Sequence, residues 1–314
     1  MAGAAYPVPV ITVLAGGTGG ARLARGIADA AGPSELTVIA NTGDDVEIYG
    51  VHVSPDPDLV AFTLADLIDE RGWGIRGDSF AVMDALERAG RPAWFRLGDA
   101  DLALCLLRTE RLRAGERLTL AHAEVCRAIG LPASVLPMSD ESVRTQVRLD
   151  GRWLGFQEFM IGAGGKHGGN IEGVELAGIE HAHPTQEVLA AIEDAETIVI
   201  GPSNPVISIG PMLALDGVQE ALTNAAAPVV AVSPFVHGRA IKGPTEDFCR
   251  WASLPLGTEC MLKAYGGVID GVVADEPAER AAVPVHVTET LMDTALARRR
   301  LAEETLEFAA TLRG

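Results

Sequence analysis

The stretch Ile11–Arg25, with the sequence ITVLAGGTGGARLAR, constrains the fold of this chain more than any other. Ile11–Leu14 is a short apolar run rich in β-branched residues, which is typical of a buried strand. Four glycines follow within five positions, and Ala21–Ala31 then returns to helical spacing, with Leu23 and Ile27 on one face. A strand that leads through glycines into a helix predicts an α/β unit whose helix begins with free backbone N–H groups.

The glycine-rich turn between this strand and this helix is a candidate anion site, and it consists of Gly16, Gly17, Thr18, Gly19 and Gly20. Free N–H groups at a helix N-terminus bind phosphate readily, and so many adjacent glycines exceed what a turn requires. The alternative is a tight turn that binds no ligand. Arg22 stands where the dinucleotide fingerprint needs glycine or alanine, and the Gly-Lys-Ser/Thr of a Walker loop is missing. We therefore expect a phosphate loop of another kind, or none.

A second strand, Leu36–Ala40, follows the first helix and completes a β-α-β unit. This unit predicts an α/β fold, a Rossmann-like three-layer α/β/α arrangement around a mostly parallel sheet. Asn41, Asp44 and Asp45 come directly after the second strand. Because ligands gather at the carboxyl ends of parallel strands, these residues and the glycine-rich turn should lie on the same rim.

Two further carboxylates, Asp56 and Asp58, stand in the segment SPDPD, before a helix expected over Leu59–Glu70. Four aspartates within fifteen positions, expected on loops, can supply oxygen ligands to Mg²⁺, which takes one or two carboxylates together with phosphates and water. Asp44 and Asp56 are also explained as caps of helices or turns. Asp45 and Asp58 are therefore the two aspartates that we expect to be functional.

Residues 59–131 are predicted to form a mostly helical insertion. Asp99 and Asp101 stand at the start of one of its helices, and capping explains at least one of these acids. Three arginines of the insertion are cation candidates for a phosphate, although each taken singly is better explained as a surface charge: Arg96, Arg108 and Arg111.

The second half of the chain carries three weaker signals. Asp150-Gly151 between two strand-like runs predicts a β-hairpin. The glycine cluster at 162–169, which contains Lys166, fits a loop near a ligand and a flexible solvent loop equally well. Ser203 and Asn204 follow a strand predicted over Thr197–Ile200 and are small polar donors where a phosphate or a ribose would bind.

The composition excludes several classes of partner. The 314 residues carry a net charge of −18, which argues against nucleic acid or an anionic membrane as the main partner. The four cysteines form no CxxC pair, and this pattern is typical of a reduced, cytoplasmic protein. The first ten residues lack the positive charge and the long apolar run of a signal peptide, and no apolar stretch is long enough to span a bilayer.

Nearly the whole chain resembles the CofD family, the transferases that act late in the assembly of the deazaflavin coenzyme F-420. No single motif is decisive, but their order and separations are highly specific. The matching segments are AGGTGGAR (15–22), NTGDD (41–45), SPDPD (54–58), RGWGI (71–75), WFRLGDADLA (94–103), PMSDESVRT (137–145), FQEF (156–159), GPSNPVISIGPML (201–213) and AVSPFVHGRAIKGP (231–244).

The resemblance implies a single transferase domain over residues 1–314. It also implies a magnesium-dependent phosphoryl transfer without a covalent enzyme intermediate. The donor would be a guanosine-diphosphate-linked three-carbon acid, the acceptor the ribityl hydroxyl of Fo (7,8-didemethyl-8-hydroxy-5-deazariboflavin), and the leaving group GMP. A homodimer is implied by the resemblance alone.

Carried over by position, Asp58 matches the acceptor-site aspartate of the family, which binds the metal or orients the attacking hydroxyl. Asp45 is its companion as catalytic and metal residue. The glycine-rich turn, Asn41, Ser203 and Asn204 would surround the nucleotide diphosphate, and Asp99 would belong to the acceptor side.

Two departures from the family pattern concern the acceptor. Relatives usually carry Arg or Lys where this chain has Ala100, and several basic residues where it has IGAGGKHGG. Lys166 or Arg96 would have to supply the missing charge. The main alternative function is that of a regulatory nucleotide-sugar-binding protein from a related gluconeogenesis-linked group, although the acidic PDPD and LGDADLA segments favour the transferase. An NAD-binding oxidoreductase is disfavoured because the fingerprint fails.

Overall fold

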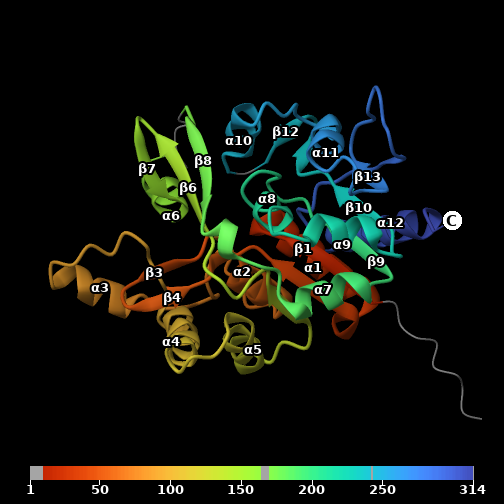
Figure 1. Cartoon of the computed structure of the whole chain (residues 1–314). Helices are drawn as coiled ribbons and strands as arrows, with labels where there is room; N and C mark the ends of the chain where they lie inside the picture. The colour runs from red at the N-terminus through yellow and green to blue at the C-terminus, as the bar shows by residue number, and fades with distance from the viewer. Residues whose placement is uncertain (1–9, 164–169, 242, 314) are drawn as a thin grey trace, which may run out of the picture.

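A seven-stranded parallel sheet forms the centre of the molecule in the computed structural model, which describes residues 10–163, 170–241 and 243–313 (Figure 1). Every pair of neighbouring strands in this sheet is parallel, which confirms the predicted α/β class. From one edge to the other, the strands are β14 (Val285–Val287), β13 (Gly271–Ala274), β10 (Val229–Val232), β9 (Thr197–Ile200), β1 (Ile11–Ala15), β2 (Leu36–Ala40) and β5 (Ser134–Pro137).

Helices cover both faces of the sheet and give the predicted three layers. The core on one face is built with α1 (Gly17–Ala31), α2 (Pro55–Leu64), α5 (Leu118–Ala128) and α12 (Ala295–Thr311). The core on the other face is built with α7 (Gln186–Glu193), α8 (Gly210–Leu213), α9 (Val218–Asn224), α10 (Thr245–Trp251) and α11 (Thr258–Ala264).

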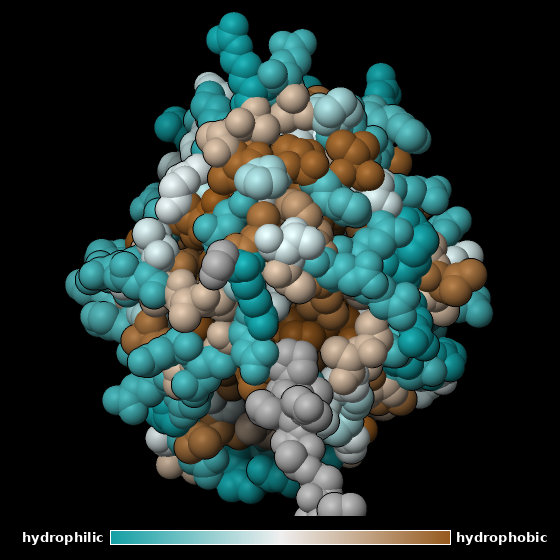
Figure 2. Space-filling model, turned by 90° about the vertical axis from the view of Figure 1, so that its right-hand side faces the viewer, coloured by the Kyte–Doolittle hydropathy of each residue, from teal (hydrophilic) through white to brown (hydrophobic). Residues whose placement is uncertain are grey.

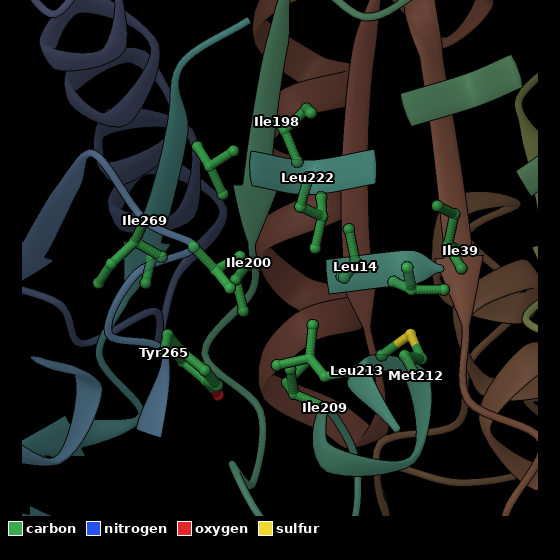
Figure 3. Close-up of a cluster of buried hydrophobic side chains, with 14 of the residues drawn as sticks. Leu14, Ile39, Ile198, Ile200, Ile209, Met212, Leu213, Leu222, Tyr265 and Ile269 are labelled. Atoms are coloured by element: carbon green, nitrogen blue, oxygen red, sulfur yellow. The ribbon is translucent and has the colours of Figure 1, made fainter. Parts of the chain in front are cut away.

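The central strands are buried on both faces, as parallel strands with apolar runs require. Every residue of β1 is buried, and its side chains alternate between the two cores: Leu14 belongs to one and Val13 to the other. Figure 3 shows Leu14, Ile39, Ile198 and Ile200 from the sheet meeting Met212, Leu213 and Leu222 from the covering helices.

A second, antiparallel sheet contains β7 (Arg152–Gly155), β6 (Arg144–Leu149) and β8 (Gly173–Ala177). Asp150 and Gly151 join β6 to β7 with φ of +49° and +73°, the positive pair that a tight hairpin turn needs, so the predicted hairpin is confirmed. The second strand of the hairpin ends at Gly155, because α6 (Phe156–Glu158) begins directly after it and continues as a π-helix (Phe159–Ala163). Phe156 of α6 and Phe159 of the π-helix both pack against Phe248.

The predicted helical insertion contains α3 (Ala81–Arg88), α4 (Asp99–Arg113) and α5, and it packs against a hairpin of β3 (Val46–Ile48) and β4 (Val51–Val53) (Figure 1). Its own small core includes Val51, Val53, Met83 and Cys105. The segment Pro92–Phe95, which connects α3 to α4, is irregular. The remaining short elements are β11 (Phe235–Val236), β12 (Arg239–Ala240) and the 3₁₀ turns Pro33–Glu35 and Ile179–His181.

One helix boundary changes the interpretation of the acidic segment. The helix expected from Leu59 begins at Pro55, a residue whose fixed φ suits the first helical position. Asp56 and Asp58 therefore lie in the first turn of α2 and not on a loop, which corrects the expectation from sequence. Negative side chains are favourable there, since they face the positive end of the helix dipole.

The outer surface is mixed in hydropathy. Figure 2 shows one face on which hydrophilic residues, in teal, surround hydrophobic ones, in brown. No helix in the described ranges is both long enough and apolar enough to cross a membrane. All four cysteines are buried and free. The first nine residues and Lys166, which carried expectations from sequence, lie outside the described residues.

Candidate functional site

The candidate site lies where the strand order of the main sheet reverses. β1 pairs with β2 on one side and with β9 on the other, so the chain leaves β1 in one direction and later returns on its opposite flank. The glycine-rich turn follows β1, the NTGDD segment follows β2, and Ser203 and Asn204 follow β9. Such a reversal is the usual ligand site of open parallel sheets.

The N-terminus of α1 already holds two acceptors from the protein. The Gly17 amide donates to Asp56 Oδ1 at 2.8 Å, and the Gly16 amide donates to Ser203 Oγ at 3.1 Å. This arrangement agrees with an anion-binding turn, since a carboxylate occupies it. Within the described chain, no side chain accepts from the Thr18 or Gly19 amides.

Close packing explains three of the four glycines. A Cβ atom at Gly19 would lie 2.0 Å from the Pro202 carbonyl oxygen, and one at Gly20 would lie 2.6 Å from Ser203 Oγ. A Cβ at Gly16 would lie 2.7 Å from the Ser208 Cβ. Gly17 differs, because it has open space around it and a φ of +66°. The number of glycines favoured phosphate binding when only the sequence was considered. In the structure, most of these glycines are needed because the turn packs closely against the segment after β9.

Asp44 and Asp56 form a buried acidic pair that shares one amide group. The Asn41 Nδ2 group lies 3.2 Å from Asp44 Oδ1 and 3.0 Å from Asp56 Oδ2. Burial, followed by the charge of Asp56, raises the pKa of Asp44 well above its usual range. Burial also raises the pKa of Asp56 to about 6. Among the described residues, no basic side chain pairs with either carboxylate, so this pair carries uncompensated negative charge when ionised.

Asp45 makes its side-chain hydrogen bonds with residues of the β3–β4 hairpin and the segment after it. Its Oδ1 accepts from Ser54 Oγ at 2.7 Å, and its Oδ2 lies 2.8 Å from His52 Nε2. The other ring nitrogen of His52, Nδ1, lies 2.8 Å from Glu47 Oε1. The Asp45 side chain is completely buried. In this arrangement it orients its neighbours and offers no surface to a substrate.

Asp58 is paired with Arg108, which corrects the sequence-based view of that arginine. Arg108 is completely buried, so it is neither a surface charge nor a side chain exposed to a phosphate. Its Nη1 and Nη2 each donate to one oxygen of Asp58 at 2.7 Å. Burial by itself would raise the pKa of Asp58, but the adjacent guanidinium outweighs burial and the net shift is downward.

Asp101 and Cys105 complete this part of the site. Burial, followed by the charge of Asp58, raises the pKa of Asp101 to about 7. The ligand atoms of Asp58, Asp101 and Cys105 lie within 4.8 Å of one another, a spacing that could hold a metal ion. The Arg108 guanidinium, however, contacts both Asp58 and Cys105, and its positive charge opposes a cation there.

Asp99 and Arg96 make their contacts within the insertion. Asp99 accepts from the Ser79 hydroxyl and from the Ala81 and Val82 amides, so it caps the start of α3. Arg96 pairs with Asp84 and Glu87. The amides of Ala100 and Asp101 donate to Asp78, so Asp78, and not Asp101, caps α4. The structure therefore explains Asp99 and Arg96 as local supports and does not bring them into contact with the aspartates after β2.

Asn204 also has a structural role. Its Oδ1 accepts from the Val206 and Ile207 amides, and its Nδ2 donates to Thr245 Oγ1 at 3.4 Å. Ser203 is the member of this predicted pair that contacts the glycine-rich turn.

The sequence interpretation missed the roles of His52 and Arg108. A signal for Arg108 exists, because Asp101, Cys105 and Arg108 are spaced four and three apart and share one face of α4. A buried arginine on such a face requires an acidic partner, but the spacing alone does not identify Asp58 as that partner.

The family model for "2-phospho-L-lactate transferase CofD" matches residues 11–309. A phosphoenolpyruvate transferase from Streptomyces griseus is 36% identical, with 96% of this chain and 99% of the relative covered. A 2-phospho-L-lactate transferase from Methanocaldococcus jannaschii is 35% identical, with 96% and 99% covered.

A solved structure supports the fold alone. A UPF0052 family protein from Bacillus halodurans superimposes with a TM-score of 0.62 at 19% identity, covering 95% of this chain and 99% of that one.

Proposed function

The chain belongs to the CofD family, and on this premise we propose that it transfers a phospho-three-carbon-acid group to the deazaflavin Fo in coenzyme F-420 biosynthesis. The donor is a guanosine-diphosphate-linked acid carrying phospholactate, phosphoenolpyruvate or a similar group. The ribityl hydroxyl of Fo attacks the phosphorus atom that bears the three-carbon acid. A new P–O bond forms, the bond to the guanylate phosphate breaks, the hydroxyl proton is lost and GMP leaves.

The observation that carries this proposal is the meeting of an acidic cluster with the N-terminus of α1 at the sheet reversal. Phosphoryl transfer needs little covalent chemistry from the protein, so positioning and electrostatics supply most of the rate enhancement. In this proposal the free amides of Thr18 and Gly19 bind the diphosphate of the donor. The aspartates bind the acceptor hydroxyl and the cation. The match to curated transferases over almost their full length favours this function over the regulatory nucleotide-sugar-binding alternative.

We assign Asp58 to the acceptor hydroxyl. Arg108 occupies one lone-pair direction of each Asp58 oxygen, and a carboxylate oxygen can accept a second hydrogen bond. Because its pKa is lowered, Asp58 stays ionised and accepts a hydrogen bond from the hydroxyl. Asp45 fixes the side chains of His52 and Ser54 through its two carboxylate oxygens.

The donor set fits magnesium best at Asp44 and Asp56. Two buried carboxylates with raised pKa values and no basic partner in the described chain gain from a divalent cation. Thr42, two residues before Asp44, has a buried Oγ1 without a hydrogen-bond partner among the described residues, and this oxygen is a further candidate ligand. The predicted ligands Asp45 and Asp58 remain candidates, with their oxygens already hydrogen-bonded. Bound magnesium would supply neutralisation of phosphate charge.

The test is direct. The purified protein is incubated with Fo, magnesium and, in turn, the lactyl, enolpyruvyl and glyceryl donors, and the product is followed by mass. We expect a phosphodiester product and GMP with at least one donor, and a loss of product when magnesium is chelated. No product with any of the three donors, together with tight binding of a nucleotide sugar, would contradict the transferase function.

Two further properties belong to this proposal. We propose a cytoplasmic location, which four buried free cysteines support. We also propose a homodimer, on the family resemblance alone. Size-exclusion chromatography with light scattering measures the molar mass of the protein in solution and distinguishes a dimer from a monomer.

A further inference from the structure

The buried ion pair on the inserted helix α4 has a role beyond charge compensation. Arg108 is completely buried and contacts both Asp58 oxygens at 2.7 Å, a bidentate geometry that fixes the plane of the carboxylate. A buried pair of this kind is weak evidence for stability, because desolvation cancels much of the attraction. Its geometric consequence is a single orientation for Asp58.

The same helix also fixes the hairpin that carries the partner of Asp45. Nε and Nη2 of Arg108 each lie 3.4 Å from the His52 carbonyl oxygen. The next residue, Thr109, accepts from the His52 amide at 2.8 Å and donates to the Cys105 carbonyl at 2.6 Å. Both backbone polar groups of His52 are therefore bound by consecutive residues of α4.

These contacts join the two aspartates that the sequence predicts to be catalytic. The backbone of His52 is bound by α4, and the ring of the same residue lies 2.8 Å from Asp45. Asp58 lies on α2, and Asp45 follows β2, so neither strand pairing nor helix packing alone sets their relative position. Arg108 contacts the Asp58 side chain and the backbone of the residue that holds Asp45.

We infer that Arg108, supported by Thr109, is a positioning residue of the transfer site, which holds Asp58 and the His52–Asp45 pair in one fixed arrangement. The inference rests on the proposed function, because Asp58 matters for the reaction only if the site performs this transfer. A direct phosphate contact by Arg108 is excluded by its complete burial. The insertion then contributes to catalysis through α4 without contacting a substrate at this position.

The experiment compares Arg108→Lys with a matched control, Arg113→Lys. Arg113 lies on the same helix and donates to the Gly50 carbonyl of the same hairpin, but it is exposed and pairs with no aspartate in the described part of the chain. We expect Arg108→Lys to lower kcat by about tenfold or more, with KM for donor and acceptor changed by less than about threefold, since misplacement by about 1 Å is costly to the chemical step. The control should keep the parent kcat. A kcat for Arg108→Lys within about twofold of the parent, after correction for the folded fraction, overturns the inference.

A double variant separates positioning from an independent effect. Because Arg108 acts through Asp58, Asp58→Asn with Arg108→Lys should be no slower than Asp58→Asn alone. Additive losses overturn the inference. If Arg108→Lys does not fold, Thr109→Val decides: a loss in kcat of about threefold or more supports the inference, and an unchanged kcat overturns it.

Crystal structures of the parent and Arg108→Lys provide a readout that does not depend on activity. We expect the Asp58 carboxylate to rotate and the His52–Asp45 distance, 2.8 Å here, to increase. An unchanged arrangement overturns the inference. A parent protein that makes no product with any donor defeats the proposed function, and the two structures still decide whether Arg108 positions these aspartates.

Discussion

Asp56 and Asp58 lie two residues apart in the first turn of α2, are equally buried, and have opposite electrostatic environments. Asp58 faces the insertion and binds a buried guanidinium, whereas Asp56 faces the sheet and shares an amide with another carboxylate. The pKa of Asp58 is lowered and that of Asp56 is raised to about 6. Burial alone therefore does not determine whether an aspartate is ionised; the partner supplied by the tertiary structure does.

The largest expected effect comes from Asp58→Asn. Because the site proposed here relies on this carboxylate, we expect kcat for the coenzyme product to fall by about a thousandfold or more. The substitution also leaves the Arg108 charge buried without its carboxylate partner. We expect a loss of about 3 kcal/mol in unfolding free energy, measured by denaturant titration. Full activity at saturating magnesium would show that the Asp58 side of the comparison is structural only.

The neighbouring substitution, Asp56→Asn, should have the opposite effect on stability. Ionised Asp56 is unfavourable in the metal-free folded state, so its removal should raise the unfolding free energy at pH 7 by about 1 kcal/mol, while the magnesium concentration needed for half-maximal activity rises. The folded state holds the Asp56 proton up to pH about 6, whereas the unfolded state releases it near 3.8. Asp56 therefore makes parent stability decrease as pH rises through this window, and the variant should lose this part of the pH dependence. A destabilised variant with parent-like magnesium dependence would remove the contrast with Asp58.

A smaller effect concerns His122, on the Arg108 side of the comparison. Burial lowers the pKa of His122 to about 4, so the folded state keeps the ring neutral while the unfolded state binds a proton near 6.5. The contribution of His122 to stability is thus lost as pH falls from about 6.5 to about 4, the reverse of the Asp56 slope. In His122→Asn we expect the unfolding free energy to fall by about 2 kcal/mol less than in the parent between pH 6.5 and pH 4. Denaturant titrations at several pH values measure this difference. Identical slopes in parent and variant would show that His122 has the same pKa in the folded and unfolded states and contributes no pH dependence.

The smallest expected effect is that of Ala100→Arg, at the exposed start of α4. Its amide is bound by Asp78, so a longer side chain there leaves the cap intact and stability within about 0.5 kcal/mol. We expect KM for Fo to fall by about threefold or more, because the variant supplies the positive charge that the family resemblance implies near the acceptor. Arg88→Gln, on the exposed end of α3, is a control for a nonspecific charge effect. An unchanged KM would place acceptor recognition elsewhere.

The sequence predicted the local elements well where a short pattern controls them. The strands Leu36–Ala40 and Thr197–Ile200 have the predicted bounds, and the Asp150-Gly151 turn forms the predicted hairpin. These features depend on apolar runs and on residues that accept positive φ, which are properties of a few neighbouring positions. The start of α2 was missed because the proline-rich segment was interpreted as a loop, although proline at the first helical position favours a helix start.

The sequence by itself determined the α/β class, the family, and the rim that the glycine-rich turn shares with Asp44 and Asp45. Only the tertiary structure decided which of the site's aspartates has a cation beside it, because Arg108 is 50 residues from Asp58 along the chain and reaches it through the packing of α4 against the β3–β4 hairpin. The same holds for the glycine-rich turn, where contacts with a segment after β9 account for three glycines that suggested a phosphate. The identity of a residue is local information, but its ionisation and its partner depend on contacts between distant parts of the chain.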